Sequence, residues 1–402
     1  MNINFKELAN KYKTPYYVYD FDHITSQYTE LKDAFKARKS LVAYAVKANS
    51  NLSVIKHLAN LGAGADCVSI GEVRRALKVG IAPYKIIFSG VGKIDDEIRE
   101  ALNLDILMIN VESDAELNRV EMIAKELDKI ARISIRVNPN IDPQTHPYIS
   151  TGLHENKFGV DIDTAKRMYI QCKNSNNLDP VGIHLHIGSQ LTQLDPIKES
   201  VKIVADLVRN LKAINIELSF MDIGGGLGIV YDNEKLIDTK EYAQSVLETM
   251  FGLDITVVCE PGRFMVGNAG TFITKVLYEK VNGNKRFVIV DGAMNDLIRP
   301  ALYNAHHKIE VIDKSSDISD CNLVGPICES GDFFAKNIEL PKTEHNDLVA
   351  IYSAGAYCFT MASNYNTRGR VAEIAVENGQ DRLIRKRETF EDIIALEEEF
   401  IK

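Results

Sequence analysis

The chain has 402 residues, which is longer than one ordinary domain and therefore predicts two. Its composition, 45% hydrophobic and 26% charged, is that of a globular protein. A formal net charge of −9 without a strongly basic segment argues against nucleic acid as a partner, because phosphate binding requires clustered Lys and Arg.

No targeting or membrane signal is recognised in the sequence. Residues 1–13 are mixed polar, and no apolar run is long enough to span a bilayer. The scattered cysteines form no CxxC pair, so we expect reduced thiols rather than disulfides or zinc. They are Cys67, Cys172, Cys259, Cys321, Cys328 and Cys358. We therefore expect a cytoplasmic protein that binds no membrane.

The first predicted elements are a short apolar run, Pro15–Tyr19, and a helix, His23–Ala37. From about residue 40 to about residue 263, apolar runs of strand length alternate with amphipathic stretches. These runs are Leu41–Val46, Ala65–Ser69, Ile86–Ser89, Ile106–Ile109, Ile133–Val137, Val181–Ile187, Phe220–Ile223 and Thr256–Cys259.

The stretches between these runs place apolar residues three and four apart, as in amphipathic helices. They are Ser53–Leu61, Gly71–Val79, Asp95–Leu102, Asp114–Leu127, Asp163–Cys172, Pro196–Leu211 and Tyr242–Met250. Eight strands and seven helices over about 220 residues predict a (β/α)8 TIM-type barrel. A doubly wound open sheet is the alternative, and the strand count favours the barrel.

After about residue 270 the pattern changes to strands with few helices. The predicted strands are Phe272–Val281, Arg286–Asp291, Lys308–Ile312, Leu348–Ser353 and Arg370–Val376, and Glu391–Phe400 is a predicted helix. We expect residues 22–265 to form the barrel, and residues 1–21 and 266–402 to form an all-β sandwich or barrel. Pro15–Tyr19 is a candidate strand of that second domain.

In such a barrel the active site lies at the carboxyl ends of the strands. Ionisable groups, hydroxyls and glycines follow several of the predicted strands, which is not a random selection. They are Lys47, Asp66, Arg136, His186–Ser189, Gly224–Gly226 and Glu260–Arg263. These residues are therefore the candidate site.

Each of these residues has a structural and a chemical interpretation. Lys47 is either a solvated lysine or an amine that forms a Schiff base. Gly224–Gly226 is either a tight turn or a phosphate loop. Glu260 either forms an ion pair or holds a proton on a heteroaromatic nitrogen. His184 and His186 alternate as metal ligands do, but we recognise no further acidic cluster beside them and expect no metal.

Together these segments resemble the fold-type III pyridoxal-phosphate enzymes, and specifically the diaminopimelate decarboxylases. The likeness extends over nearly the whole chain, in family order. The matching segments are Tyr44–Asn49, His186–Gln190, Gly224–Gly226, Glu260–Arg263, Gly325–Asp332 and Gly355–Tyr357. The resemblance implies an alanine racemase-like fold and the cofactor pyridoxal 5'-phosphate.

The resemblance also implies roles for single residues. Lys47 carries the cofactor, His186 stacks on its ring, and Glu260 pairs with the ring nitrogen. Asp66 and Arg136 support the cofactor. The phosphate contacts involve Ser189, Gly225, Gly226, Gly262, Arg263 and Tyr357.

The implied reaction is the decarboxylation of meso-2,6-diaminopimelate to L-lysine and CO2, the last step of lysine biosynthesis. Glu260 favours decarboxylation, because the related racemases carry an arginine there. Cys328 is the implied proton donor. Members of this family are homodimers in which Cys328 and Glu329 reach the active site of the other subunit.

The far end of this substrate carries an ammonium and a carboxylate, and both charges need partners. The expected substrate-binding residues are Arg263, Arg299, Tyr303, Glu329 and Tyr357. Carboxynorspermidine, ornithine or lysine as substrate, or cofactor binding without catalysis, remain alternatives. The segment Ile149–Val160 resembles a specificity loop of this group.

Overall fold

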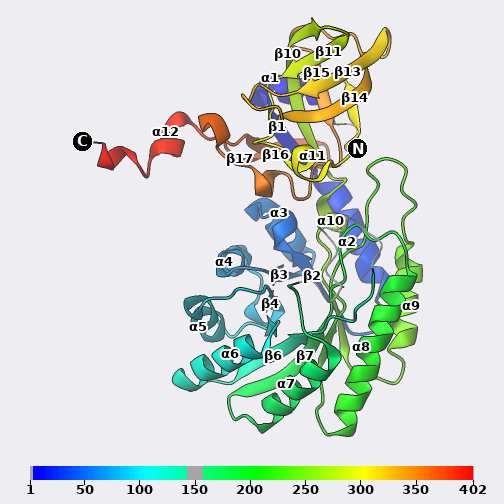
Figure 1. The fold of residues 1–402 in the computed structure, drawn as a ribbon, viewed down its shortest axis with the longest axis vertical. Coiled ribbons are helices and arrows are strands. Elements are labelled where there is room, and N and C mark those ends of the chain that lie inside the picture. Colours follow the sequence, from blue (N-terminus) through cyan, green and yellow to red (C-terminus); the bar gives the residue numbers. More distant parts are fainter. Residues whose placement is uncertain (1–2, 143–156, 402) are drawn as a thin grey trace. The chain divides into compact units, whose positions relative to one another are not determined.

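The computed structural model describes residues 3–142 and 157–401 (Figure 1). The chain divides into two compact units. One, here called the barrel unit, comprises Thr25–Ile229 and Lys235–Met265. The other, here called the β unit, comprises Met1–Ile24, Val230–Glu234 and Val266–Lys402. Most of the predicted specificity loop, residues 149–156, lies outside the described residues.

The barrel unit contains the predicted closed barrel of eight parallel strands, so the open-sheet alternative is wrong. Each apolar run in the sequence became a strand, and β2 pairs with both β3 and β9 to close the ring. The strands are β2 (Ser40–Ala45), β3 (Gly64–Cys67), β4 (Ile86–Phe88), β5 (Met108–Val111), β6 (Ala131–Arg136), β7 (Leu178–His184), β8 (Phe220–Asp222) and β9 (Thr256–Cys259).

Seven helices follow the strands at the predicted places and lie outside the barrel in Figure 1. Several begin at a capping side chain: Ser69, Ser113 and Asp161 each accept a hydrogen bond from a first-turn amide. The helices are α3 (Leu52–Asn60), α4 (Ile70–Lys78), α5 (Asp95–Asn103), α6 (Asp114–Glu126), α7 (Ile162–Asn174), α8 (Asp195–Ala213) and α9 (Thr239–Thr249).

The β unit is built on one sheet with the order β14-β13-β11-β10-β1-β16-β17, and β15 joins β10 to β12. The first strand of the chain, β1 (Tyr16–Asp20), lies between β10 and β16, as the run Pro15–Tyr19 suggested. The other strands are β10 (Gly270–Asn282), β11 (Lys285–Val290), β12 (Ile309–Val311), β13 (Ile318–Val324), β14 (Phe333–Pro341), β15 (Leu348–Ile351), β16 (Ala372–Glu377) and β17 (Gln380–Arg385).

The remaining α-helices of the described residues precede the barrel or belong to its end and to the β unit. They are α1 (Phe5–Tyr12), α2 (Phe21–Ala34), α10 (Arg263–Val266), α11 (Arg299–Tyr303) and α12 (Phe390–Ile394). The predicted helix Glu391–Phe400 is wrong in extent, because α12 ends at Ile394 and only a 3-10 turn follows at Glu398–Phe400. No described helix combines the length and the apolar character needed to cross a membrane.

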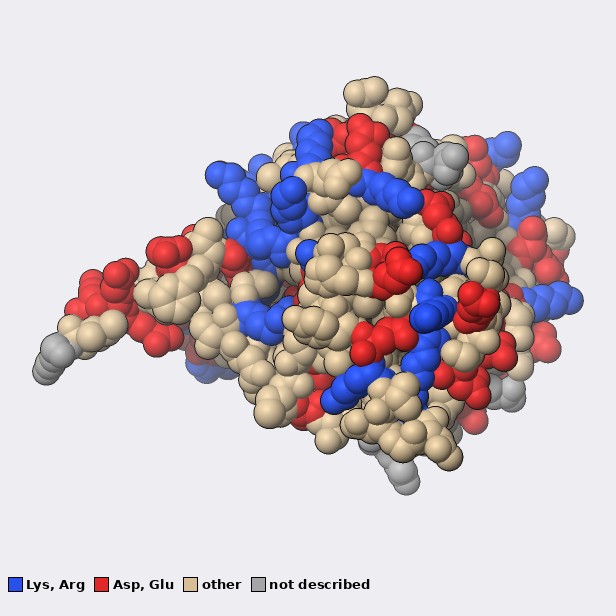
Figure 2. Space-filling model, turned by 90° about the horizontal axis from the view of Figure 1, so that it is seen from above, with Lys and Arg blue, Asp and Glu red and all other residues tan. Residues whose placement is uncertain are grey.

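The surface carries both signs of charge. On the face drawn in Figure 2, Lys and Arg side chains are interspersed with Asp and Glu over most of the area. Acidic side chains gather on the C-terminal segment, which contains Glu391, Asp392 and Glu397–Glu399.

Candidate active site

Lys47 and Asp66 form an ion pair at the carboxyl ends of neighbouring barrel strands. Lys47 lies in the 3-10 turn Val46–Ala48 directly after β2, and Asp66 lies on β3. The Lys47 Nζ is 2.6 Å from Asp66 Oδ2, and the two side chains are 35% and 0% exposed. Burial, and then the charge of Glu260, raises the pKa of Asp66, whereas Lys47 opposes the rise. The amine is therefore held at the barrel mouth and is still accessible.

A buried cluster of His184, Asp222 and Glu260 lies at the ends of β7, β8 and β9. Their ligand-type atoms all lie within 4.8 Å of one another, and His184 Nε2 is 3.2 Å from Glu260 Oε2. The expectation that no acidic cluster adjoins the histidines is therefore wrong. Sequence reasoning missed this cluster because its members are 38 or more residues apart and come together only when the barrel closes.

Burial and neighbouring charges shift the pKa values of the two carboxyl groups of this cluster in opposite directions. Burial alone would raise the pKa of Glu260, but His184 and Lys47 together hold it below its usual value. Burial and then the Glu260 charge raise the pKa of Asp222 well above its usual value. Asp222 Oδ2 and Glu260 Oε1 lack a donor among the described residues as long as both groups are ionised. A neutral Asp222 can donate a hydrogen bond to a charged Glu260.

The glycine turn Gly224–Gly226 follows β8, and each of its glycines lies close to a backbone oxygen of another segment. A Cβ at Gly224 would lie 2.4 Å from Leu185 O, and one at Gly225 would lie 2.1 Å from Glu260 O. Gly224 and Gly226 also have positive φ angles of 66° and 112°. The Gly226 amide makes no hydrogen bond within the described part of the chain, so it is available to a ligand.

His186 is held in one tautomer by this turn. The Gly225 amide donates to His186 Nδ1 over 3.2 Å, so Nε2 carries the hydrogen of the neutral ring. Burial, and then the Arg136 and Lys47 charges, lowers the pKa of His186 well below its usual value. The imidazole is therefore expected to be neutral, and a neutral ring can stack on an aromatic cofactor. Because the Gly225 amide already donates to His186, it is not free to bind a phosphate. Gly225 would contribute to phosphate binding through the absence of a side chain.

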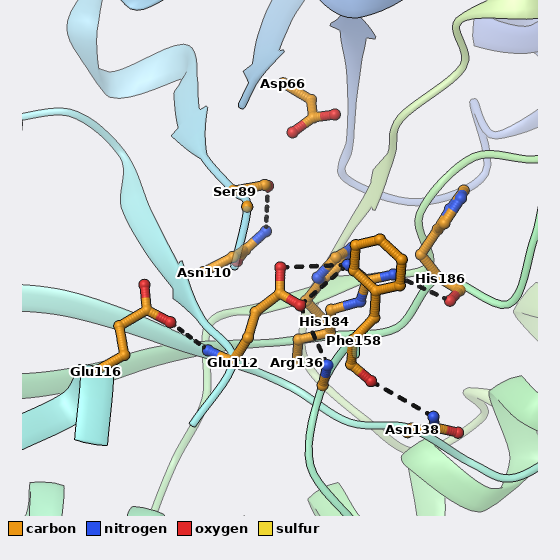
Figure 3. A network of polar contacts seen from close by, with 12 residues as sticks. Asp66, Ser89, Asn110, Glu112, Glu116, Arg136, Asn138, Phe158, His184 and His186 are labelled. Carbon is orange, nitrogen blue, oxygen red and sulfur yellow. Dashed lines mark hydrogen bonds and ion pairs between the residues drawn. The ribbon is translucent and has the colours of Figure 1, made fainter. Parts of the chain in front are cut away.

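Arg136 belongs to a polar network that sequence reasoning only partly recognised (Figure 3). Its Nη1 lies 3.2 Å from both Glu112 oxygens, and its Nη2 lies 3.4 Å from His186 O. The guanidinium also lies 4.7 Å from the Phe158 ring centroid, and the Gly159 amide donates to Glu112. Glu112 follows β5 directly, so the strand-end rule that selected Lys47 would also have selected Glu112.

Ser189 and Arg263 meet at the side of the barrel mouth formed after β7 and β9. Arg263 Nε and Nη2 lie 3.3 Å and 3.1 Å from Ser189 Oγ. Arg263 begins α10 and is buried, and Gly262 directly precedes it. A hydroxyl, a guanidinium and a glycine thus stand together, as the predicted phosphate contact requires.

The remaining predicted residues belong to the β unit. Cys328 and Glu329 lie exposed in the turn between β13 and β14, and the Cys328 amide donates to Asn366 Oδ1 over 3.4 Å. Tyr357 has a positive φ of 57° and is partly buried. Arg299 and Tyr303 are the first and last residues of α11, and Pro300 lies in its first turn. Arg299 is buried.

The barrel mouth fits the phosphate and ring of pyridoxal phosphate. An accessible lysine amine, an ionised buried carboxylate and a neutral histidine ring lie on strand ends of one barrel. The glycine turn offers a close backbone approach with the Gly226 amide. These are the groups that an aldehyde, a pyridine nitrogen, an aromatic ring and a phosphate need.

Gly225→Ala is expected to lower both cofactor affinity and stability. The new methyl group would collide with the Glu260 carbonyl and displace the carboxylate beside it. Overpacking of this kind costs about 1–3 kcal/mol of unfolding free energy. Cofactor titration and thermal melting measure the two effects. Gly92→Ala is the matched control, since a Cβ there meets nothing within 4 Å. Unchanged affinity in Gly225→Ala would exclude the turn from the cofactor site.

Known proteins match both the barrel and the full chain. The family described as pyridoxal-dependent decarboxylase, pyridoxal binding domain, matches residues 21–267. Diaminopimelate decarboxylase of Campylobacter jejuni is 59% identical over 401 residues, covering 100% of both chains. That of Pseudomonas aeruginosa is 48% identical over 389 residues, covering 96% of this chain and 94% of its own.

Solved structures agree with these sequence matches. Diaminopimelate decarboxylase from Helicobacter pylori, crystallised with L-lysine, is 55% identical, with a TM-score of 0.97 and coverage of 99% of this chain and 100% of its own. The enzyme from M. jannaschii, also with L-lysine, is 38% identical, with a TM-score of 0.92 and coverage of 97% and 93%. The chain therefore belongs to the pyridoxal-dependent decarboxylases, within the group of the diaminopimelate decarboxylases.

Proposed function

We propose that this protein uses pyridoxal 5'-phosphate to decarboxylate meso-2,6-diaminopimelate to L-lysine and CO2, the last step of lysine biosynthesis. The observation that carries the reaction type is the buried Glu260, kept ionised in the barrel whose mouth holds Lys47. The substrate rests on relatives of that name that match over the full length, two of which were crystallised with L-lysine. Cytoplasm is the proposed compartment.

The bound cofactor supplies a conjugated ring that accepts the electron pair released when the Cα–carboxylate bond breaks. Lys47 would hold the cofactor through its amine, which the ion pair with Asp66 positions. Glu260 stabilises a proton on the ring nitrogen, since a carboxylate favours a nearby cation. His186 would support the cofactor ring. The Gly225 amide donates to its imidazole, and Arg136 donates to its backbone carbonyl.

The phosphate is proposed to bind at the side of the barrel mouth formed by the turns after β7, β8 and β9. Its charge is opposed by Arg263, and hydrogen bonds come from Ser189 and the Gly226 amide. Gly225 allows the close approach, and the amides around Gly262 are proposed as further donors. Tyr357 of the β unit is proposed to contact both the phosphate and the substrate.

The exposed turn between β13 and β14 is proposed to return the proton to the substrate and to serve the active site of a second subunit. We assign Cys328 as the proton donor to Cα and Glu329 as the partner of the distal ammonium. Both are proposed to act in the active site of the second subunit of a homodimer. Their exposure in the single chain supports this, because a group that serves another subunit must be accessible before assembly.

The distal carboxylate of the substrate is assigned to Arg263, Arg299 and Tyr303. A guanidinium matches a carboxylate in bidentate geometry, and a buried one is costly to leave without an anion. Ornithine and lysine decarboxylases act on substrates without this carboxylate, so these arginines distinguish diaminopimelate from the alternatives.

A substrate panel tests the proposal directly. The cofactor-loaded protein is incubated with meso-diaminopimelate, ornithine, lysine and carboxynorspermidine, and CO2 and product amine are measured by mass spectrometry. We expect L-lysine from diaminopimelate and no CO2 from the other three. Release from another substrate alone would overturn the assignment of the distal carboxylate, and release from none would favour a cofactor-binding protein without catalysis.

A further inference from the structure

Arg299 is a buried cation whose hydrogen-bonded partner is a neutral ring. Its side chain is 7% exposed, and its Nη1 lies 2.9 Å from His307 Nε2, which is itself 3% exposed. The guanidinium carbon lies 4.8 Å from the Tyr231 ring centroid. Tyr231 and His307 also contact each other edge to face, at 5.5 Å and 87°. All three residues belong to the β unit.

The direction of the hydrogen bonds fixes the state of His307. Its Nδ1 lies 2.9 Å from the Tyr352 carbonyl oxygen, which can only accept, so Nδ1 carries a hydrogen. Arg299 can only donate, so Nε2 must offer a lone pair. His307 is therefore the neutral Nδ1–H tautomer, and it connects Arg299 to the backbone beside β15.

Arg299 forms no ion pair within the described chain. None of the ion pairs among residues 3–142 and 157–401 includes Arg299. An imidazole and a phenol ring hold its position without cancelling its charge. A buried cation without an anion is unfavourable, so an anionic group of a ligand would bind here with a gain in electrostatic energy.

We propose that His307 and Tyr231 are positioning residues that hold Arg299 as a receptor for a ligand carboxylate. His307 gives Arg299 a fixed orientation through an acceptor that carries no charge. A carboxylate at position 307 would hold the arginine equally well but would neutralise it. This inference rests on the proposed function, since it takes the distal carboxylate of the substrate as the ligand group, and it assigns selectivity for that group to residues beyond Arg299.

Two ligands that differ by one carboxylate test the proposal. L-lysine is the product of the proposed reaction, and cadaverine is the same diamine without the carboxylate. Their dissociation constants are measured by calorimetry on the cofactor-loaded protein and on three variants, His307→Phe, His307→Gln and His307→Glu. Values of kcat and KM for diaminopimelate are measured in parallel.

We expect wild-type protein to prefer L-lysine over cadaverine. His307→Phe should weaken L-lysine binding and raise KM by about tenfold, the order of one hydrogen bond to a charged group, and leave cadaverine unaffected. His307→Gln, which retains an acceptor, should recover most of this loss. His307→Glu should abolish the preference, because its charge occupies Arg299. kcat should change far less than KM in each variant.

The controls separate the two levels of the argument. His345→Phe replaces an exposed histidine of the same unit that also forms a hydrogen bond with a backbone carbonyl. This variant should change the affinity for neither ligand. Cofactor absorbance and melting temperature establish that each variant is folded. If His307→Phe weakens the binding of both ligands equally, or if the preference for L-lysine survives in His307→Glu, the proposed role of His307 is wrong. The assignment of Arg299 to the carboxylate is then still open. A wild-type protein that binds both ligands alike overturns the carboxylate assignment itself.

Discussion

Replacing Lys47 by alanine is expected to abolish turnover and the absorbance of bound cofactor near the visible edge. The absorbance arises from the covalent link between the Lys47 amine and the cofactor, and alanine has no nucleophile to form it. The ion pair with Asp66 is lost at the same time, so a second variant is needed to separate charge from chemistry. Absorption spectra and CO2 release measure the two losses.

Lys47→Arg provides this separation. Arginine keeps a positive charge for Asp66 but cannot serve as the nucleophile, because its guanidinium stays protonated. We expect Lys47→Arg to be as colourless and inactive as Lys47→Ala, and to remain folded by thermal melting. A wild-type spectrum in either variant would move the cofactor link to another lysine.

Replacing Cys328 by alanine is expected to lower turnover by about 10²–10⁴-fold, the usual contribution of a general acid. Cofactor absorbance should stay unchanged, because the proposed role of Cys328 is to return a proton after CO2 has left. Cys321→Ala is the control, since Cys321 is a buried cysteine of β13, the strand that leads to the same turn. Full activity in Cys328→Ala would remove this thiol from the mechanism.

Mixing the two inactive variants tests the shared site. If each site takes Lys47 from one subunit and Cys328 from the other, a mixed dimer contains one intact site. Mixing Lys47→Ala and Cys328→Ala in equal amounts should then restore about a quarter of wild-type activity after subunit exchange. No recovery, with exchange verified by mass spectrometry, would place both residues in the same subunit's site.

The barrel was predictable because each strand has a strong local signal. Runs such as Leu41–Val46 are buried on both faces and need no partner to be recognised. In the β unit, β13, β14 and β17 were missed. Their burial alternates irregularly, and β17 at the edge contains no fully buried residue. Strands of this kind are defined by their partners, and a single sequence does not reveal those partners.

The site was predictable where chemistry follows a strand directly, as at Lys47 and Glu260. The contacts between side chains around the site were not predictable from the sequence. His184 with Glu260 and Arg299 with His307 are contacts that depend on which side chains turn inward, and periodicity carries no such information. The protonated state expected for Asp222 likewise arises only from burial beside Glu260.

The central place of β1 imposes an order on synthesis. Tyr16 pairs with Ile273 on one side and Ala372 on the other, so the second pairing cannot form until nearly the whole chain has left the ribosome. The barrel lies between β1 and β10 in sequence. It is nearly continuous and can fold while the chain grows. During that time β1 remains an unsatisfied strand edge. Nascent chains stalled before residue 372 should therefore carry a folded barrel and an aggregation-prone N-terminus.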